Sequence, residues 1–144
     1  MMDTMTIQEY REHLEQAKRK KGTASQTKNR AFEFWEQCLK DKGFTFDNAL
    51  HNDTYTFEYK FHEKRRFRAD MAFVHNEICW LQEYEGMVFN ANQGTGKSGH
   101  TTPKGFTSNT EKYSLAAILG YRVLRYTLYN YRLFAEHLKM ILKK

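Results

Sequence analysis

The segment from Tyr55 to Phe89 constrains the fold most, because it reads as three consecutive β-strands. Residues 55–61 alternate between the two faces of a sheet, and the next two strands are expected at 66–74 and 78–89. The polar residues His75, Asn76 and Glu77 between them suit a tight turn. The sequence therefore predicts a β-hairpin formed by the second and third of these strands.

The elements on either side of this block indicate an α/β fold. Helices are expected at 28–42, 108–120 and from 132 to the end, with a loop at 90–106 and a strand at 121–127. Ser108 and Glu111 form a capping-box pattern at the start of the middle helix. A helix between two strands suggests a crossover connection, so we expect a mixed sheet flanked by helices.

The N-terminus is expected to form an arm that is separate from the main domain. Residues 5–21 have helical spacing and end in four consecutive basic residues, and Gly22 to Thr27 reads as a linker. We assign residues 1–25 to this basic helical arm and residues 26–144 to a single domain. A solvated helix with a charged end remains an equal alternative for the arm.

The composition favours a polyanionic partner. The chain of 144 residues carries a net charge of +6, with a pI of about 9.3. Nucleic acid is the first candidate for the partner of such a basic protein. Cys38 and Cys79 lie far apart and form no CxxC motif, so neither a zinc site nor a disulfide is indicated. No apolar run has the length of a membrane helix, and a cytoplasmic location is the default.

Three acidic residues in the hairpin predict a metal site. A two-residue turn at Asn76 and Glu77 would place Asp70 directly across from Glu83. Glu85 follows Glu83 on the same face, with the two Cβ atoms roughly 7 Å apart. Like charges this close favour a cation, and Mg²⁺ binds carboxylates, water and phosphate oxygens. The alternative is an exposed strand face with ordinary arginine–glutamate pairs.

Alternation along the strand expected at 66–74 places charged side chains on one face and apolar side chains on the other. Arg66 and Arg68 are expected on the same face as Asp70. The opposite face would carry the apolar side chains Phe67, Ala69, Met71 and Phe73.

Lys112 is the candidate for a positive charge at this site. It shares the inward-facing stripe of the predicted helix with Leu115, Ala116 and Leu119. A lysine there either extends to solvent or meets an acidic partner. If it meets the acids, it can orient a water molecule or stabilise charge on a phosphate.

Four segments of the chain resemble a known nuclease family. Residues 58–73, EYKFHEKRRFRADMAF, look like the EYRFHPxRRWRFDFAF stretch of small phage-type endonucleases in the PD-(D/E)xK, restriction-endonuclease-like superfamily. Residues 83–86 resemble the ExEGG strand of that family, and residues 119–127, LGYRVLRYT, resemble LGWRVLRFT. Residues 100–114 are similar to RHxRxxGFxxDxEKYN, so the resemblance covers about residues 30–128.

The resemblance implies a restriction-endonuclease-like sheet and phosphodiester hydrolysis dependent on Mg²⁺ or Mn²⁺. Carried over by position, Asp70 and Glu83 are metal ligands. Glu85 stands where the wider superfamily has its lysine, so Lys112 is the candidate to take over that role. We therefore take Asp70, Glu83, Glu85 and Lys112 as the catalytic group, and the three acids as its metal ligands.

The resemblance also concerns an acid on the first family helix and two positions that differ from the family pattern. An acid on the first family helix, Glu33 or Glu36, is left open as a further site residue. The chain departs from the family pattern at Met87, where a second glycine is typical, and at Asn109, where an aspartate is typical. Either departure can alter the fit of the substrate.

The loop at 90–106 contains a misleading nucleotide-binding pattern. Residues 91–98 match a relaxed Walker A motif, but the residues after Ser98 are not expected to begin a helix that would cradle phosphates. We instead expect Lys97, His100 and Lys104 to contact a DNA backbone, together with Arg66 and Arg68. A flexible surface loop is an equal alternative.

The sequence thus predicts an Mg²⁺-dependent endodeoxyribonuclease that acts on DNA in a bacterial or phage-infected cell. Branched recombination or repair DNA is a candidate substrate by analogy with the fold. The alternative is a non-catalytic nucleic-acid-binding module on the same fold. No membrane partner is expected, and a homodimer is left open.

Overall fold

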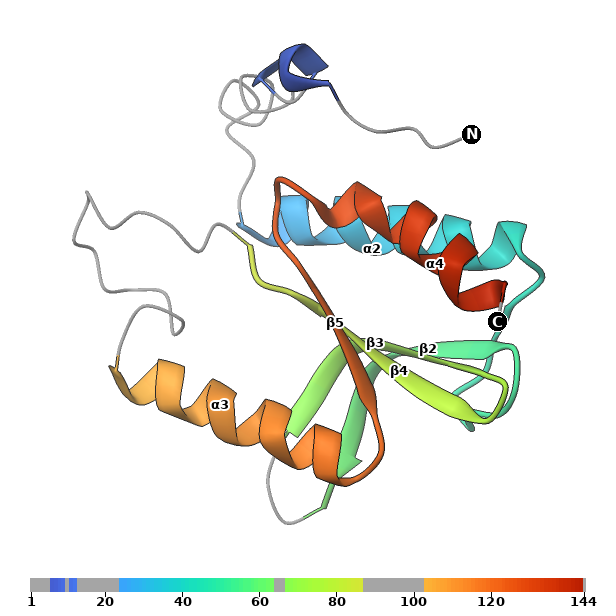
Figure 1. Cartoon of the computed structure of the whole chain (residues 1–144), viewed down its shortest axis with the longest axis vertical. Coiled ribbons are helices and arrows are strands. Elements are labelled where there is room, and N and C mark those ends of the chain that lie inside the picture. Colours follow the sequence, from blue (N-terminus) through green and yellow to red (C-terminus); the bar gives the residue numbers. More distant parts are fainter. Residues whose placement is uncertain (1–5, 10, 13–23, 64–66, 87–102, 144) are drawn as a thin grey trace.

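A computed structural model of the chain describes residues 6–9, 11–12, 24–63, 67–86 and 103–143. Its elements in chain order (Figure 1) are α2 (Ala24–Asp41), β1 (Thr45–Phe46), β2 (Thr54–His62), β3 (Phe67–His75), β4 (Ile78–Tyr84), α3 (Pro103–Ile118), β5 (Arg122–Tyr126), the 3-10 turn η2 (Tyr131–Leu133) and α4 (Phe134–Leu142). The predicted α/β class is confirmed.

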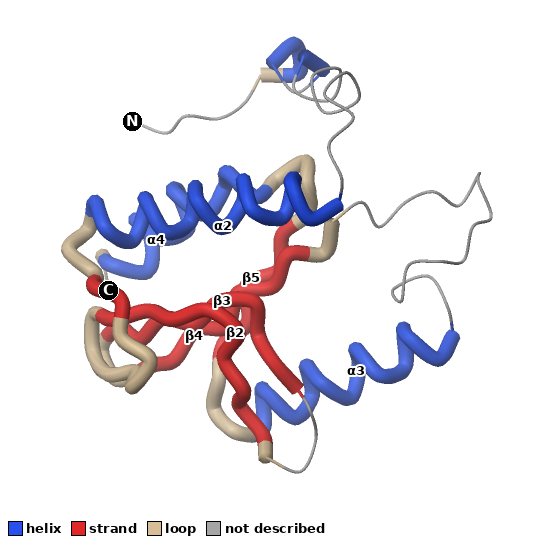
Figure 2. The backbone as a smooth tube through the Cα atoms, turned by 180° about the vertical axis from the view of Figure 1, so that it is seen from behind, coloured by secondary structure: helices blue, strands red, loops and turns tan. Residues whose placement is uncertain are grey.

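The described strands form one mixed sheet in the order β1-β2-β3-β4-β5. Strands β2, β3 and β4 are antiparallel neighbours, while β1 pairs parallel with β2 and β5 pairs parallel with β4. Helix α3 connects β4 to β5 as the expected crossover. Helices α2 and α4 cover one face of the sheet and α3 lies on the other (Figures 1 and 2).

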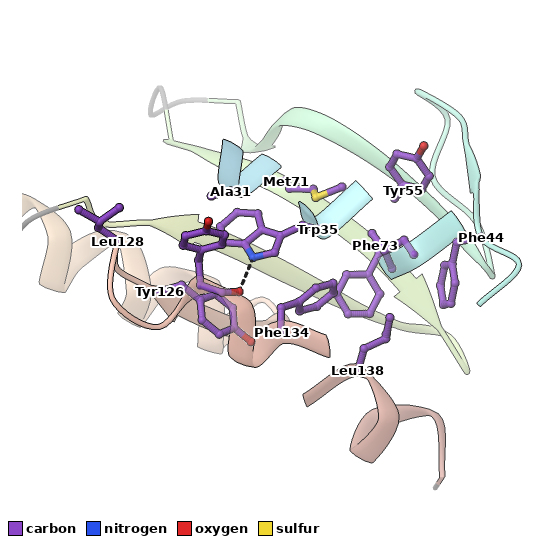
Figure 3. Close-up of a cluster of buried hydrophobic side chains, with 12 residues drawn as sticks. Ala31, Trp35, Phe44, Tyr55, Met71, Phe73, Tyr126, Leu128, Phe134 and Leu138 are labelled. Atoms are coloured by element: carbon purple, nitrogen blue, oxygen red, sulfur yellow. Dashed lines mark hydrogen bonds between the residues drawn. The ribbon is translucent and has the colours of Figure 1, made fainter. Parts of the chain in front are cut away.

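Two hydrophobic clusters hold these layers together. The larger one lies between the sheet and helices α2 and α4, with Trp35 at its centre (Figure 3). The indole Nε1 of Trp35 donates a hydrogen bond to the carbonyl oxygen of Tyr131 at 2.9 Å, so the one polar atom of this buried ring is satisfied. The smaller cluster packs Ala116 of α3 against Ala72 and Leu81 of the sheet.

Two helix starts differ from the sequence-based expectation. Helix α3 begins at Pro103 instead of Ser108, so Ser108 lies inside the helix and is not its cap. Proline suits the first helical position because its missing N–H has no partner to lose there. Helix α2 begins at Ala24, so the predicted linker at 22–27 overlaps its first turn. Of the predicted arm, only residues 6–9, 11–12 and 24–25 are described.

The apolar side chains of β3 change faces at Asp70, which corrects the predicted alternation. Met71 and Phe73 pack in the cluster under α2 and α4. Phe67 and Ala69 pack instead in the cluster under α3. The charged and apolar positions of β3 therefore do not divide into two separate faces along its whole length.

Glu58 of β2 lies opposite this change of face. The pairs on either side of it are Phe57 with Met71 and Tyr59 with Ala69, so Glu58 faces Asp70 across the two strands. Glu58 has a φ angle of 50°, which interrupts the regular alternation of a strand. This irregularity lies opposite the position where the side chains of β3 change faces.

Candidate active site

The β3–β4 hairpin has the register that the sequence predicts. The pairs His75 with Ile78 and Met71 with Gln82 are in register. Asn76 and Glu77 form the two-residue turn, with φ angles of 50° and 65° as a type I′ turn requires. Extending the register by one pair places Asp70 opposite Glu83, as expected.

The carboxylate of Asp70 lies between the two strands of the hairpin. Its Oδ2 accepts a hydrogen bond from the backbone N–H of Tyr84 at 2.8 Å. In a regular antiparallel ladder the N–H of Tyr84 would donate to a backbone carbonyl oxygen of the neighbouring strand. Here the Asp70 side chain is the acceptor instead. Its Oδ1 lies 3.0 Å from Nζ of Lys28 in the first turns of α2.

Lys28 is a site residue that the sequence analysis did not select, although it lies on the same helical stripe as Phe32 and Trp35. Burial lowers the pKa of its ammonium group, but the hydrogen bond and charge of Asp70 outweigh that effect and the pKa is raised. Glu58 and Glu83 act in the same direction. Lys28 therefore stays protonated beside the acids.

Glu83 forms an ion pair with Lys112 of α3, which confirms that this lysine meets the acidic residues. Only 9% of the Glu83 side chain and 16% of the Lys112 side chain is exposed. Burial raises the pKa of Glu83 to about 7; Lys112 opposes the increase, and the nearby carboxylate of Asp70 adds to it.

Glu85 has different partners from the other two acids. Its Oε1 accepts hydrogen bonds from the hydroxyl of Tyr113 and from Nε of Arg125, each at 2.7 Å. The guanidinium of Arg125 lies 4.2 Å from the centre of the Tyr113 ring. Tyr113 and Arg125 are thus two further residues that sequence reasoning did not select.

The three acids do not form one ready-made metal site. Within the part of the chain that the structure describes, no three His, Cys, Asp or Glu side chains are grouped so that they could hold a metal ion together. Asp70 and Glu83 do fit a divalent cation as a pair, because they are close, largely buried and of like charge. Mg²⁺ commonly takes only one or two carboxylates and keeps several waters.

The structure describes only some of the other predicted site residues. Arg68 of β3 and Lys104 in the first turn of α3 are exposed, while Arg66, Lys97 and His100 lie outside the described residues, as do Met87 and the Walker-like segment. Glu33 of α2 is exposed, and Glu36 accepts a hydrogen bond from the Tyr55 hydroxyl at 2.6 Å. Lys28 is the α2 residue that reaches Asp70.

Comparisons with protein-family models, curated proteins and solved structures found no match to this chain. No helix among the described residues is long and apolar enough to cross a membrane.

Proposed function

We propose that the chain is a metal-dependent DNA endonuclease of the restriction-endonuclease-like type. One observation carries the proposal: Asp70 and Glu83 are two largely buried carboxylates that face each other across a hairpin, an arrangement that suits a divalent cation. Two largely buried carboxylates with two adjacent cations form a compact site in which a phosphate and a divalent cation can both be bound.

In this proposal Asp70 and Glu83 hold the metal ion. When bound, Mg²⁺ or Mn²⁺ supplies positive charge to phosphate oxygens and lowers the pKa of a water molecule. The Tyr84 amide fixes one oxygen of Asp70, so the direction of that carboxylate is set before any ligand arrives.

The two lysines supply charge around the same point. Lys112 would orient the attacking water or stabilise charge that develops on the phosphate. Lys28 would neutralise Asp70 in the metal-free protein. Exposed Arg68 and Lys104 would bind the DNA backbone through their charges, without reading sequence.

The second candidate is a nucleic-acid-binding module with no catalytic activity. The observation that favours it is that both acids already have a lysine partner, so the site is electrically balanced without a metal ion. The free thiols of Cys38 and Cys79 support a reducing compartment for either function, and the cytoplasm is our proposal.

A cleavage assay separates the two candidates. Purified protein is incubated with supercoiled plasmid, single-stranded DNA and a four-way junction, with Mg²⁺, Mn²⁺ or EDTA. The variants are Asp70→Asn and Glu83→Gln, with Asp41→Asn as the control that removes an exposed carboxylate from the C-terminal end of α2. We expect metal-dependent cleavage by the wild type and the control. Binding to all three DNAs without cleavage would favour the binding module.

A further inference from the structure

Arg125 lies beside the acidic pair in the sheet. In the parallel pairing of β4 with β5, its Cα is the register partner of Glu83. The backbone N–H of Glu85 continues this pairing by donating a hydrogen bond to the carbonyl oxygen of Tyr126 at 2.6 Å. The register therefore fixes the distance between Arg125 and the site.

The side chain of Arg125 is held from two directions. Its Nε donates to Glu85, whose side chain is only 5% exposed, and the ring of Tyr113 lies against its guanidinium. Tyr113 donates its hydroxyl hydrogen to the same Glu85 oxygen. Burial and that hydrogen bond both raise the pKa of Tyr113, which keeps the hydroxyl protonated as a donor.

The Arg125 side chain remains partly accessible. Half of the Arg125 side chain is exposed, at 51%, and the bond to Glu85 uses only one of its five N–H donors. A fixed, forked set of donors matches two oxygens of a phosphate. Asp70 and Glu83 are already paired with Lys28 and Lys112, so a further cation is needed to offset the negative charge that a phosphate would add.

We infer that Arg125 binds a phosphate of the DNA backbone at the proposed cleavage site, and that Glu85 and Tyr113 hold its guanidinium in place. The assignment, which rests on the proposed function, makes Glu85 a positioning residue rather than a metal ligand. Arg125 thus adds a positive charge from β5 to the one that Lys112 of α3 supplies at Glu83.

Arg122 provides a matched control on the same strand. It lies three residues before Arg125, and its guanidinium lies over the ring of Trp80, 5.4 Å from the ring centre. It lines a separate pocket of about 300 Å³ together with His75 and His137. Replacing Arg122 removes an equal charge from β5 away from the acids.

The first test compares Arg125→Met with Arg122→Met. We expect Arg125→Met to lower kcat/KM about 100-fold or more. It should also reduce the slope of log affinity against log salt by about one. Arg122→Met should leave kcat/KM close to wild type, and Arg125→Lys should recover the salt slope but not kcat/KM. Equal kcat/KM and equal slopes for Arg125→Met and wild type would overturn the assignment.

The second test measures Mn²⁺ affinity by calorimetry. Glu85→Gln should lower kcat/KM as Arg125→Met does, while Mn²⁺ binds as in wild type. If Glu85→Gln weakens Mn²⁺ binding as much as Asp70→Asn does, Glu85 is a metal ligand and the positioning role is wrong.

The failure of the proposed function can be told apart from the failure of this inference. If the wild type binds DNA but cleaves none, the nuclease proposal fails. The salt slope of Arg125→Met against Arg122→Met then still decides whether Arg125 contacts a phosphate. Thermal unfolding of each variant shows whether it is folded, and Arg125→Gln, which also removes the charge, replaces Arg125→Met if the latter is not.

Discussion

Lys112 of α3 forms an ion pair with Glu83 of β4, and this pair joins the crossover helix to the acidic end of the hairpin. Both side chains are largely buried, so neither charge can be removed without leaving the other poorly solvated. The pair links the stability of the fold to the electrostatics of the candidate site.

Replacing Lys112 with Met should destabilise the metal-free protein at pH 8 by roughly 3 kcal/mol, because a buried carboxylate loses its partner. The free energy of unfolding in urea measures this effect. In the Glu83→Gln background the same replacement should cost much less. Equal costs in the two backgrounds would show that Lys112 stabilises the fold without help from Glu83.

The stability of the metal-free protein should fall as the pH rises from about 5 to above 7. The pKa of Glu83 is raised to about 7 when folded, so the folded state binds this proton more tightly than the unfolded state does. The stabilising effect is present at low pH and is lost as the pH passes the folded pKa. Urea unfolding in EDTA at several pH values measures the slope, and Glu83→Gln should flatten it. An unchanged slope in that variant would contradict the assignment.

Removing Lys28 should strengthen metal binding. In the metal-free structure its ammonium group lies 3.0 Å from Asp70, where it opposes the entry of a second cation. We expect Lys28→Met to bind Mn²⁺ about tenfold more tightly, a difference of about 1.4 kcal/mol. Arg30→Met, which removes an exposed charge from the same helix, is the control. Weaker binding in Lys28→Met would mean that the lysine helps to order the ligands.

Gln82 is a position at which a substitution should stabilise the protein. It is fully buried, and in the described structure neither its amide nitrogen nor its amide oxygen has a hydrogen-bond partner. Burying such a group costs free energy, so Gln82→Met should stabilise the protein by about 1 kcal/mol. Thermal and urea unfolding measure the change. A loss of stability would indicate that the amide is satisfied by a buried water or another ligand.

The hairpin is the part of the site that the sequence predicts best. Its register depends on the short turn at Asn76 and Glu77, and that local signal is sufficient to pair Asp70 with Glu83. The position of Lys112 near the acids could also be predicted from the sequence, because helical periodicity places it on the inward side of α3.

The remaining site residues depend on information that local sequence does not carry. Arg125 reaches Glu85 only because β5 lies parallel to β4 in one particular register, which the crossover through α3 determines. Lys28 lies on the same stripe of α2 as Phe32 and Trp35, but its contact with Asp70 depends on how α2 packs on the sheet. The change of face at Asp70 coincides with a positive φ angle at Glu58 on the neighbouring strand, and glutamate seldom adopts such an angle, so the sequence does not predict it.

The central claim is that Asp70 and Glu83 form a metal-dependent nuclease site. The most direct measurement is the initial rate of nicking of supercoiled plasmid by wild type, Asp70→Asn and Glu83→Gln, each in Mg²⁺ and in EDTA. We predict nicking by the wild type in Mg²⁺ alone, and a rate at least about 100-fold lower in both variants. Nicking that survives either substitution, or that proceeds equally in EDTA, would contradict the claim.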